Sequence, residues 1–222
     1  MEQGLSVSAS HTVQQGEHLS AIAAQYGFGD YAVVWNHPDN ASLKDVRGDP
    51  NVLLPGDTVA IPDKNTKQET GATAQRHRFT LAQTPLKLRL LLEEAYSNPV
   101  TGASCILTAN GTKTDTTTND EGKVEQRISS GLTEATLTVD VDGSLYADTA
   151  LMMSVGALDP VDVLSGQAGR LTNLGYLPGT PEAADDPAFQ SALQEFQCDY
   201  RLLVDGDPGP KTQAKLREVH GC

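Results

Sequence analysis

The stretch from His11 to Pro62 constrains most strongly how this chain of 222 residues can fold. It begins with a short strand-like run, which is followed by a polar turn around Gly16. Apolar residues then recur at the spacing of one helix face, at Leu19, Ile22, Ala23 and Tyr26. A second short helix is expected to start after Asp30 and to carry residues 33–35, and the Pro-Gly-Asp turn at 55–57 leads into a last strand at 58–61. The predicted order is strand, helix, helix, strand.

Two runs in this stretch resemble a LysM module, the small fold that holds N-acetylglucosamine polymers such as peptidoglycan or chitin. They read T-V-x-x-G-E-x-L-x-x-I-A at 12–23 and L-x-P-G-D-x-V-x-I-P at 53–62. The resemblance implies a sugar groove lined by two loops. The residues that match these loops are Gly16, Glu17, His18, Leu19, Asn51, Val52, Leu53 and Leu54. Their apolar side chains could meet the acetyl methyl groups of a glycan or could pack the core of the module, and both interpretations are open.

The stretch departs from the LysM pattern in two places. Glu17 and His18 stand where the family usually has Asp followed by Thr or Ser, so a hydroxyl that caps the first helix is missing. The segment 36–53 is longer than the family usually allows, and Asn40 could cap an extra helical turn that ends at Gly48. Since this segment forms one wall of the family's groove, its length favours protein contacts over glycan contacts.

Residues 64–77 have the composition of a linker, and the pattern then changes to that of strands. The turn signals in this part are Asn110-Gly111, Glu121-Gly122 and Asp142-Gly143. We expect a small antiparallel β-sandwich over 78–157. The runs N-P-V-T-G-A at 98–103 and T-T-T-N-D-E-G-K-V at 116–124 resemble bacterial Ig-like and carboxypeptidase-regulatory-like domains, which commonly serve as spacers.

The last segment, 158–222, has the pattern of three short helices. The expected helix-capping and helix-ending residues are Gly175, Asp186 with Pro187, and Gly209 with Pro210. The turn V-D-G-x-x-G-P-x-T at 204–212 resembles that of the peptidoglycan-binding domain appended to bacterial wall hydrolases. The resemblance implies that Tyr176, Asp205 and Thr212 lie around a glycan-binding turn. Alternatively, Asp205 and Thr212 simply hold that turn together.

The chain has three cysteines, too few for a disulfide scaffold at this length. Cys105 lies in an apolar strand-like run and is expected to be a buried, inert thiol. Cys198 and Cys222 both belong to the C-terminal segment, where they could form a disulfide or remain two free thiols. The sequence leaves these two alternatives open.

The composition excludes several classes of function. A net charge of −13 disfavours nucleic acid and anionic membranes as partners. No apolar run is long enough to span a bilayer. Residues 1–10 lack the basic region and the apolar region that together make a Sec signal. The five histidines show no metal-binding spacing, and no G-x-S-x-G motif or Gly-rich phosphate loop occurs. We therefore expect that the protein is not an enzyme and that it binds no cofactor.

Together these patterns predict a multidomain α+β chain: a loose N-terminus at 1–10, a βααβ LysM-like module at 11–63, a linker at 64–77, an Ig-like sandwich at 78–157 and a three-helix module at 158–222. Its expected function is non-catalytic binding of peptidoglycan glycan strands. The overall order is also similar to that of small proteins associated with type VI secretion spikes, so the alternative is an adaptor that binds spike or effector proteins. Without a Sec signal, we expect the chain to remain cytoplasmic until exported by another route, and to act in the periplasm, at the cell wall or on a spike.

Overall fold

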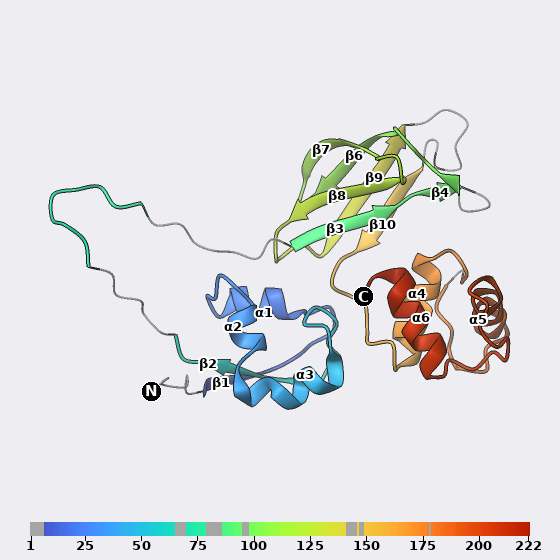
Figure 1. The fold of residues 1–222 in the computed structure, drawn as a ribbon, viewed down its shortest axis with the longest axis horizontal. Coiled ribbons are helices and arrows are strands. Elements are labelled where there is room, and N and C mark those ends of the chain that lie inside the picture. Colours follow the sequence, from blue (N-terminus) through green and yellow to red (C-terminus); the bar gives the residue numbers. More distant parts are fainter. Residues whose placement is uncertain are drawn as a thin grey trace. The chain divides into compact units, whose positions relative to one another are not determined.

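A computed structural model describes residues 7–64, 70–78, 86–94, 98–140, 146, 149–177 and 179–222. It combines helices with small antiparallel sheets (Figure 1), which confirms the mixed α and β class. The chain forms two compact units. One comprises Met1–Ile22, Ala32–Asn65 and Ala157–Cys222, and the other comprises Ala23–Tyr31 and Thr66–Gly156. The division into three domains at the boundaries given above stays a prediction. No helix among the described residues is long and apolar enough to cross a membrane.

The N-terminal elements follow the expected order of strand, helix, helix and strand, with two additions from the lengthened segment. In chain order they are β1 (Val7–Thr12), α1 (Leu19–Gln25), α2 (Ala32–Trp35), the 3₁₀ turn η1 (Pro38–Asn40), α3 (Ala41–Arg47) and β2 (Thr58–Pro62). Strands β1 and β2 pair antiparallel, with His11 opposite Val59 and Thr12 opposite Thr58. The LysM resemblance itself stays a prediction.

The apolar residues of these elements are buried where the sequence pattern predicts a core. In β2, Val59 and Ile61 alternate with more exposed residues, as expected for a strand with one buried face. The other buried apolar side chains of this part in the first unit are Val13, Leu19, Ile22, Val34, Trp35, Val52 and Leu53. Their burial supplies the hydrophobic stabilisation of a small core.

Asn40 has a different role from the helix cap that the sequence suggests. Helix α3 does begin directly after it and ends at Gly48, whose φ of 72° suits glycine, but the Asn40 side chain makes no capping bond. Instead its amide nitrogen donates to the carbonyls of Val34 and Ala60, each at 2.8 Å, and its oxygen accepts from the Ala60 N–H at 2.7 Å. The side chain is only 1% exposed. Asn40 therefore ties α2 to the edge of β2, because the β2 backbone offers it both a donor and an acceptor.

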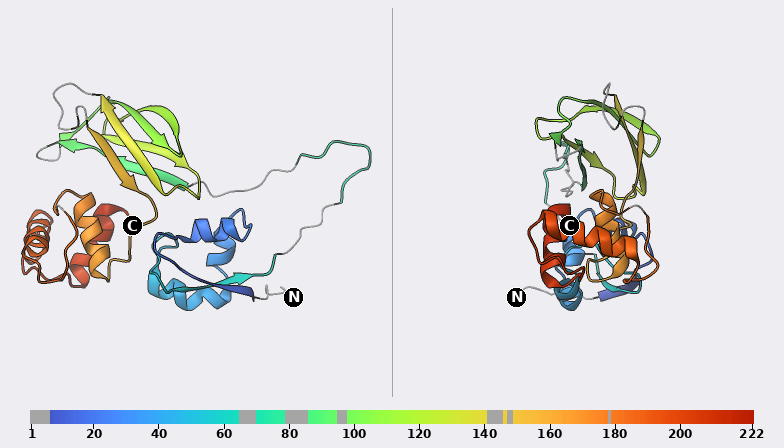
Figure 2. Two further views of the ribbon diagram at one scale, coloured as in Figure 1. Left: turned by 180° about the vertical axis from the view of Figure 1, so that it is seen from behind. Right: turned by 90° about the vertical axis from the view of Figure 1, so that its right-hand side faces the viewer.

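The middle of the chain forms antiparallel sheets. Its strands are β3 (Leu86–Leu91), β4 (Glu93–Glu94), β5 (Asn98–Pro99), β6 (Ser104–Ala109), β7 (Thr112–Thr117), β8 (Lys123–Ile128), β9 (Glu134–Asp140) and β10 (Ala150–Ser154). The largest sheet has the order β10-β9-β6-β7, and β3 pairs with β8 (Figures 1 and 2). Asn110 and Gly111, both with positive φ, form the two-residue turn between β6 and β7, as predicted. The expected Asp142-Gly143 turn lies outside the described residues.

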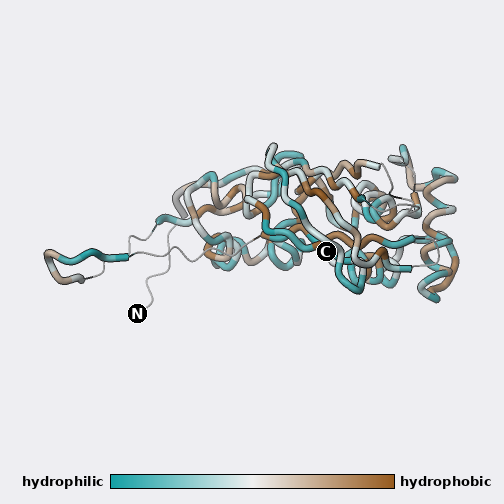
Figure 3. Tube along the Cα trace, turned by 90° about the horizontal axis from the view of Figure 1, so that it is seen from above, coloured by the Kyte–Doolittle hydropathy of each residue, from teal (hydrophilic) through white to brown (hydrophobic). Residues whose placement is uncertain are grey.

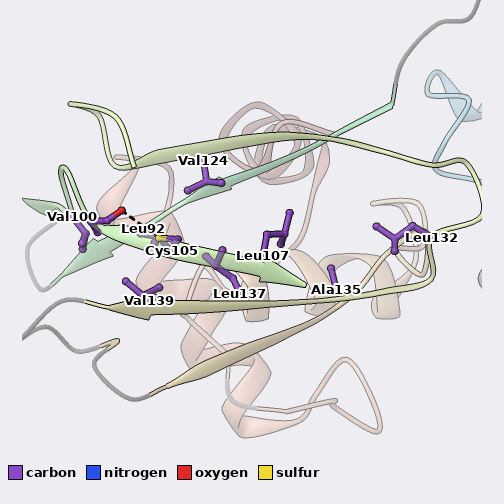
Figure 4. Close-up of a cluster of buried hydrophobic side chains, with 10 residues drawn as sticks. Leu92, Val100, Cys105, Leu107, Val124, Leu132, Ala135, Leu137 and Val139 are labelled. Carbon is purple, nitrogen blue, oxygen red and sulfur yellow. Dashed lines mark hydrogen bonds between the residues drawn. The ribbon is translucent and has the colours of Figure 1, made fainter. Parts of the chain in front are cut away.

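The four-stranded sheet and the β3-β8 pair contribute to one cluster of buried side chains. Figure 4 shows Val124 of β8 on the side of its strand that faces Cys105 and Leu107 of β6. Cys105 is 2% exposed, which confirms its predicted burial, and burial raises the pKa of its thiol. A core shared between two sheets is what a sandwich requires, while the Ig-like resemblance stays a prediction.

The C-terminal segment forms three helices, α4 (Leu164–Asn173), α5 (Pro187–Asp199) and α6 (Pro210–His220). The carboxylate of Asp186 accepts from the N–H groups of Ala188 and Phe189 at 2.8 and 3.2 Å, which confirms the predicted cap of α5. Gly209 precedes Pro210 at the start of α6, also as predicted. The hydropathy trace alternates between brown and teal along these helices, as expected for amphipathic helices (Figure 3).

Aromatic rings lie at the centre of this helical module. Phe189, Leu193 and Phe196 of α5 are fully buried together with Leu171 and Leu216. The ring of Phe196 meets two tyrosines, Tyr176 edge-on at a centroid distance of 5.5 Å and Tyr200 at 4.7 Å. Such contacts add to the stabilisation from burial and hold both tyrosines at the margin of the core.

Gly166 allows helix α4 to approach the preceding segment closely. A Cβ at this position would collide with the carbonyl groups of Asp159 and Pro160. We expect Gly166→Ala to lower the free energy of unfolding by about 1–3 kcal/mol because backbone must move to relieve the overlap. Chemical denaturation of the full chain measures this difference.

Gly169→Ala is the matched control on the same helix. Its added methyl group would meet only the flexible end of Leu158, so the higher helix propensity of alanine should leave stability unchanged or raise it by up to about 1 kcal/mol. Equal stability of Gly166→Ala and the wild type would contradict the close approach.

Candidate functional site

The two N-terminal loops expected to line a glycan groove lie next to each other. The N–H of Leu19 donates to the carbonyl of Pro50 at 3.0 Å, and the Ser20 hydroxyl donates to Asn51 Oδ1 at 2.8 Å. These bonds join the start of α1 to the loop that precedes β2. The structure therefore brings together the two sets of residues that the sequence assigned to one groove.

Only part of these two loops is available to a ligand. The side chains of His18, Leu19, Val52 and Leu53 are buried, none of them more than 6% exposed. Gly16, Glu17, Asn51 and Leu54 are partly exposed. A glycan could therefore meet the first set only through backbone groups and the second set through side chains as well. Glycan contact at all eight residues stays a prediction.

Glu17 is held at the margin of this surface by local hydrogen bonds. Its Oε2 lies 2.8 Å from His11 Nε2 and accepts from the Gln14 N–H at 2.9 Å. Burial opposes ionisation of the carboxyl, but the bonds from His11 and Gln14 outweigh it and lower the pKa of Glu17. The loop therefore carries a carboxylate at neutral pH, which can accept hydrogen bonds from sugar hydroxyls.

An ion pair braces the second loop. Asp57 accepts from Arg47 through both carboxylate oxygens, at 2.7 and 2.8 Å, and from the Leu54 N–H at 2.9 Å. Both charged side chains are about one-tenth exposed, Arg47 at 10% and Asp57 at 12%. Burial opposes ionisation of Asp57, but the bonds from Arg47 and from the Leu54 N–H outweigh it and lower its pKa. The end of α3 is thus fastened to the turn that presents Leu54.

In the helical module, one buried amide organises the turn at 204–212. Gln197 of α5 is 0% exposed. Its Nε2 lies 2.8 Å from Asp205 Oδ1, 3.0 Å from the Asp207 carbonyl and 3.2 Å from Thr212 Oγ1. Its Oε1 accepts from the N–H groups of Asp205 and Gly206 at 3.1 and 2.9 Å. A single side chain thereby satisfies the backbone of a turn that has no regular pairing of its own.

The predicted site residues Asp205 and Thr212 both belong to this network. Thr212 is buried, and its hydroxyl donates to the Asp207 carbonyl at 3.3 Å. Asp205 accepts from the Asp207 N–H at 2.9 Å as well as from Gln197. The alternative role, holding the turn together, therefore describes the contacts of both residues, and their contact with glycan stays a prediction. Gln197 was missed, because a glutamine next to the apolar face of an amphipathic helix gives no signal of burial.

The third predicted residue, Tyr176, lies at the edge of the module. Its hydroxyl donates to Asp199 Oδ2 at 2.9 Å. Burial and this bond to a carboxylate raise the pKa of Tyr176, so it remains a neutral hydrogen-bond donor. The connection that follows α5 exposes two apolar side chains, Leu203 at 78% and Val204 at 51%, directly before Asp205. Apolar side chains and polar groups occur together there, which is the combination that sugars need.

The helical module contains two thiols and one imidazole, those of Cys198, Cys222 and His220. Cys198 and Cys222 are free thiols in the structure, so it contains no bridge between them. Cys222 Sγ lies 3.1 Å from His220 Nδ1. Burial raises the pKa of Cys222, whereas burial and nearby Arg170 lower that of His220 to about 4, so both groups are neutral at pH 7. Within the described ranges, no three His, Cys, Asp or Glu side chains are placed to hold a metal ion.

The ion pair of Asp57 predicts a pH-dependent stability. Asp57→Asn should lower the free energy of unfolding by about 2 kcal/mol at pH 7 because it removes a charged acceptor of three bonds. The pKa of Asp57 is lowered in the folded state, so its contribution is complete above the usual value of 3.8 and is lost as pH falls through the folded value. Urea denaturation at pH 7 and pH 3 should show the difference from wild type narrowing in acid. Asp45→Asn, at an exposed position of α3, should change neither value, and an equal loss at both pH values would refute the ion pair.

Gln197→Leu tests the organising amide. Leucine has a similar size but leaves the N–H groups of Asp205 and Gly206 without their acceptor, so we expect a loss of about 2–3 kcal/mol. Gln194→Leu, at an exposed position of the same helix, should remain within about 0.5 kcal/mol of wild type. Thermal and chemical denaturation measure both, and equal stability of the two variants would show that the network contributes nothing.

Comparison with known proteins identifies part of this module. Residues 167–216 match one family model, described as a putative peptidoglycan binding domain. The matched region contains all of α5, most of α4 and α6, and the turn organised by Gln197. No curated protein and no solved structure matches the chain. The resemblance of the C-terminal segment to a peptidoglycan-binding domain is confirmed, whereas the LysM, Ig-like and secretion-system resemblances stay predictions.

Proposed function

We propose that this protein is a non-catalytic peptidoglycan-binding protein that acts at the bacterial cell wall. The observation that carries the proposal is the peptidoglycan-binding domain matched at 167–216. Its turn is braced by a buried amide rather than by regular secondary structure, so its exposed groups are fixed before a ligand arrives. A preorganised surface loses less conformational entropy on binding.

The surface of this turn supports sugar or acetyl contacts. Leu203 and Val204 project into solvent immediately before Asp205. Exposed apolar side chains of this kind can cover acetyl methyl groups and ring faces, while nearby carbonyl, hydroxyl and carboxylate groups can meet hydroxyls and amides. The net charge of −13 opposes long-range attraction to an anionic wall, so affinity would come from these short-range contacts.

The N-terminal loops offer a second contact surface for the same polymer. Their partly exposed residues are Gly16, Glu17, Asn51 and Leu54. If both surfaces engage one glycan network, the second contact forms at a raised effective concentration, and two weak sites give firm retention.

The alternative is an adaptor whose modules contact proteins of a secretion spike. One observation favours it: α3, formed by the lengthened segment, has no buried residue, and its Val46 is 68% exposed. An exposed helix with an apolar side chain suits a protein contact better than a sugar groove. Under this alternative, the chain would not be retained by peptidoglycan.

Retention of the full chain on purified insoluble peptidoglycan tests the proposal. We expect wild type to be retained, and the double variant Leu203→Ser with Val204→Ser to bind about tenfold more weakly because apolar contact area is lost. Both side chains are exposed, so the variant should stay folded, which its unfolding midpoint will show.

Met152→Ser is the matched control, because Met152 is an exposed apolar side chain on β10, 84% exposed. It should bind as wild type does. Unchanged binding of the double variant would remove this turn from the contact surface. Failure of wild type to be retained would overturn peptidoglycan binding and favour the adaptor.

A further inference from the structure

A small cavity in the first compact unit brings charges of both signs together. Its volume is about 140 Å³, enough for several water molecules or a small ligand group. The charged or polar side chains that line it, and on which the following argument rests, are Arg47, Asp49, Asp162, Arg170, Arg217 and Cys222. Three of these side chains are arginines, in a chain with 16 basic and 29 acidic residues.

Arg170 lines this cavity and is fixed in place by hydrogen bonds. Its side chain is 1% exposed, and backbone oxygens fix it: Nε donates to the oxygen of Cys222 at 2.9 Å, while Nη1 donates to the carbonyls of Asp159 at 2.9 Å and Gly166 at 2.7 Å. None of these bonds uses Nη2. The guanidinium is therefore rigidly placed, and a planar edge with a remaining donor suits a carboxylate oxygen.

A second positive charge lies close to Arg170. Burial lowers the pKa of Arg170, a negative charge at Cys222 opposes this shift, and the repulsion of Arg217 lowers the pKa further. Two neighbouring guanidinium groups repel each other, and an anion placed between them removes that repulsion. The pair Arg170 and Arg217 thus favours a carboxylate in the cavity.

The carboxylates that line the cavity repel an anion and attract a cation. Arg47 is already neutralised by the two bonds to Asp57, although its Nη1 also lies 3.6 Å from Asp162. The negative charges of Asp49 and Asp159 act on Arg170, and Asp49 and Asp162 both line the cavity. A simple anion would gain from two arginines and be repelled by two carboxylates, whereas a group with both charges would gain from each.

We propose that this cavity binds a short zwitterionic peptide, with its carboxylate at Arg170 and Arg217 and its ammonium at Asp49 and Asp162. Peptide stems of peptidoglycan carry free carboxylate and amino groups, and they are the natural source of the ligand. Only the choice of peptidoglycan as the source of the ligand rests on the proposed function. The charge pattern of the cavity stands independently of it.

Three soluble dipeptides test the proposal by titration calorimetry with the full chain. D-Alanyl-D-alanine carries both charges, its N-acetyl form only the carboxylate, and its C-terminal amide only the ammonium. We expect the zwitterion to bind, and each capped form to bind about fivefold or more weakly because one charged contact is lost. Equal affinity for all three, binding of the N-acetyl form alone, or no binding of the zwitterion would overturn the assignment.

Single variants at the exposed edge of the cavity give a second measurement. Arg217→Gln and Asp162→Asn should each weaken zwitterion binding about fivefold, since both side chains are exposed and can be changed without unfolding the core. Arg89→Gln, at an arginine 74% exposed on β3, should bind as wild type does. Wild-type affinity in both cavity variants would contradict the site.

Retention on insoluble peptidoglycan, measured in parallel, separates this inference from the proposed function. Retention without dipeptide binding would refute the cavity and leave peptidoglycan binding intact. Dipeptide binding without retention would refute peptidoglycan as the ligand source and leave the cavity as a site for short zwitterionic peptides. Failure of the chain both to be retained and to bind the dipeptide would overturn peptidoglycan binding and the cavity assignment.

Discussion

The buried amide of Gln197 is the constraint on which the C-terminal module depends most. Its oxygen accepts from two N–H groups of the connection between α5 and α6, and its nitrogen reaches acceptors on Asp205, Asp207 and Thr212. Polar backbone in such a connection must find partners or remain in water. Because one side chain supplies those partners, the turn can be compact and can still leave Leu203 exposed.

Much of the secondary structure could be predicted from sequence because its causes are local. Asp186 caps α5 through N–H groups two and three residues away, and the positive φ values of Asn110 and Gly111 close a hairpin between adjacent strands. Proline at the first position of a helix needs no partner elsewhere in the chain. In each case the interacting groups lie within a few residues of each other, so the feature can be predicted from one sequence.

The side-chain roles that were missed depend on partners further along the chain. Asn40 bonds to Ala60, twenty residues away, so the cap that its local context suggests loses to a buried strand edge. Gln197 bonds to residues eight to fifteen positions later. His18 and Leu53 are likewise buried by tertiary packing, which the LysM-like loop motif that made them candidate groove residues does not reveal. Tertiary partners cannot be read from one sequence, and for the candidate site they decide which groups are left for a ligand.

The acidic composition also determines how such a chain can recognise a wall polymer. Basic side chains are few, and two of the arginines that the structure describes are directed inward, Arg47 to Asp57 and Arg170 to backbone carbonyls. A surface of this kind cannot rely on the long-range attraction by which basic proteins adhere to anionic polymers. Recognition must then come from contacts that act only at van der Waals and hydrogen-bond distance, which depend on the shape of the ligand. The rigid turn, the partly exposed loops and the mixed-charge cavity all offer contacts of this short-range kind.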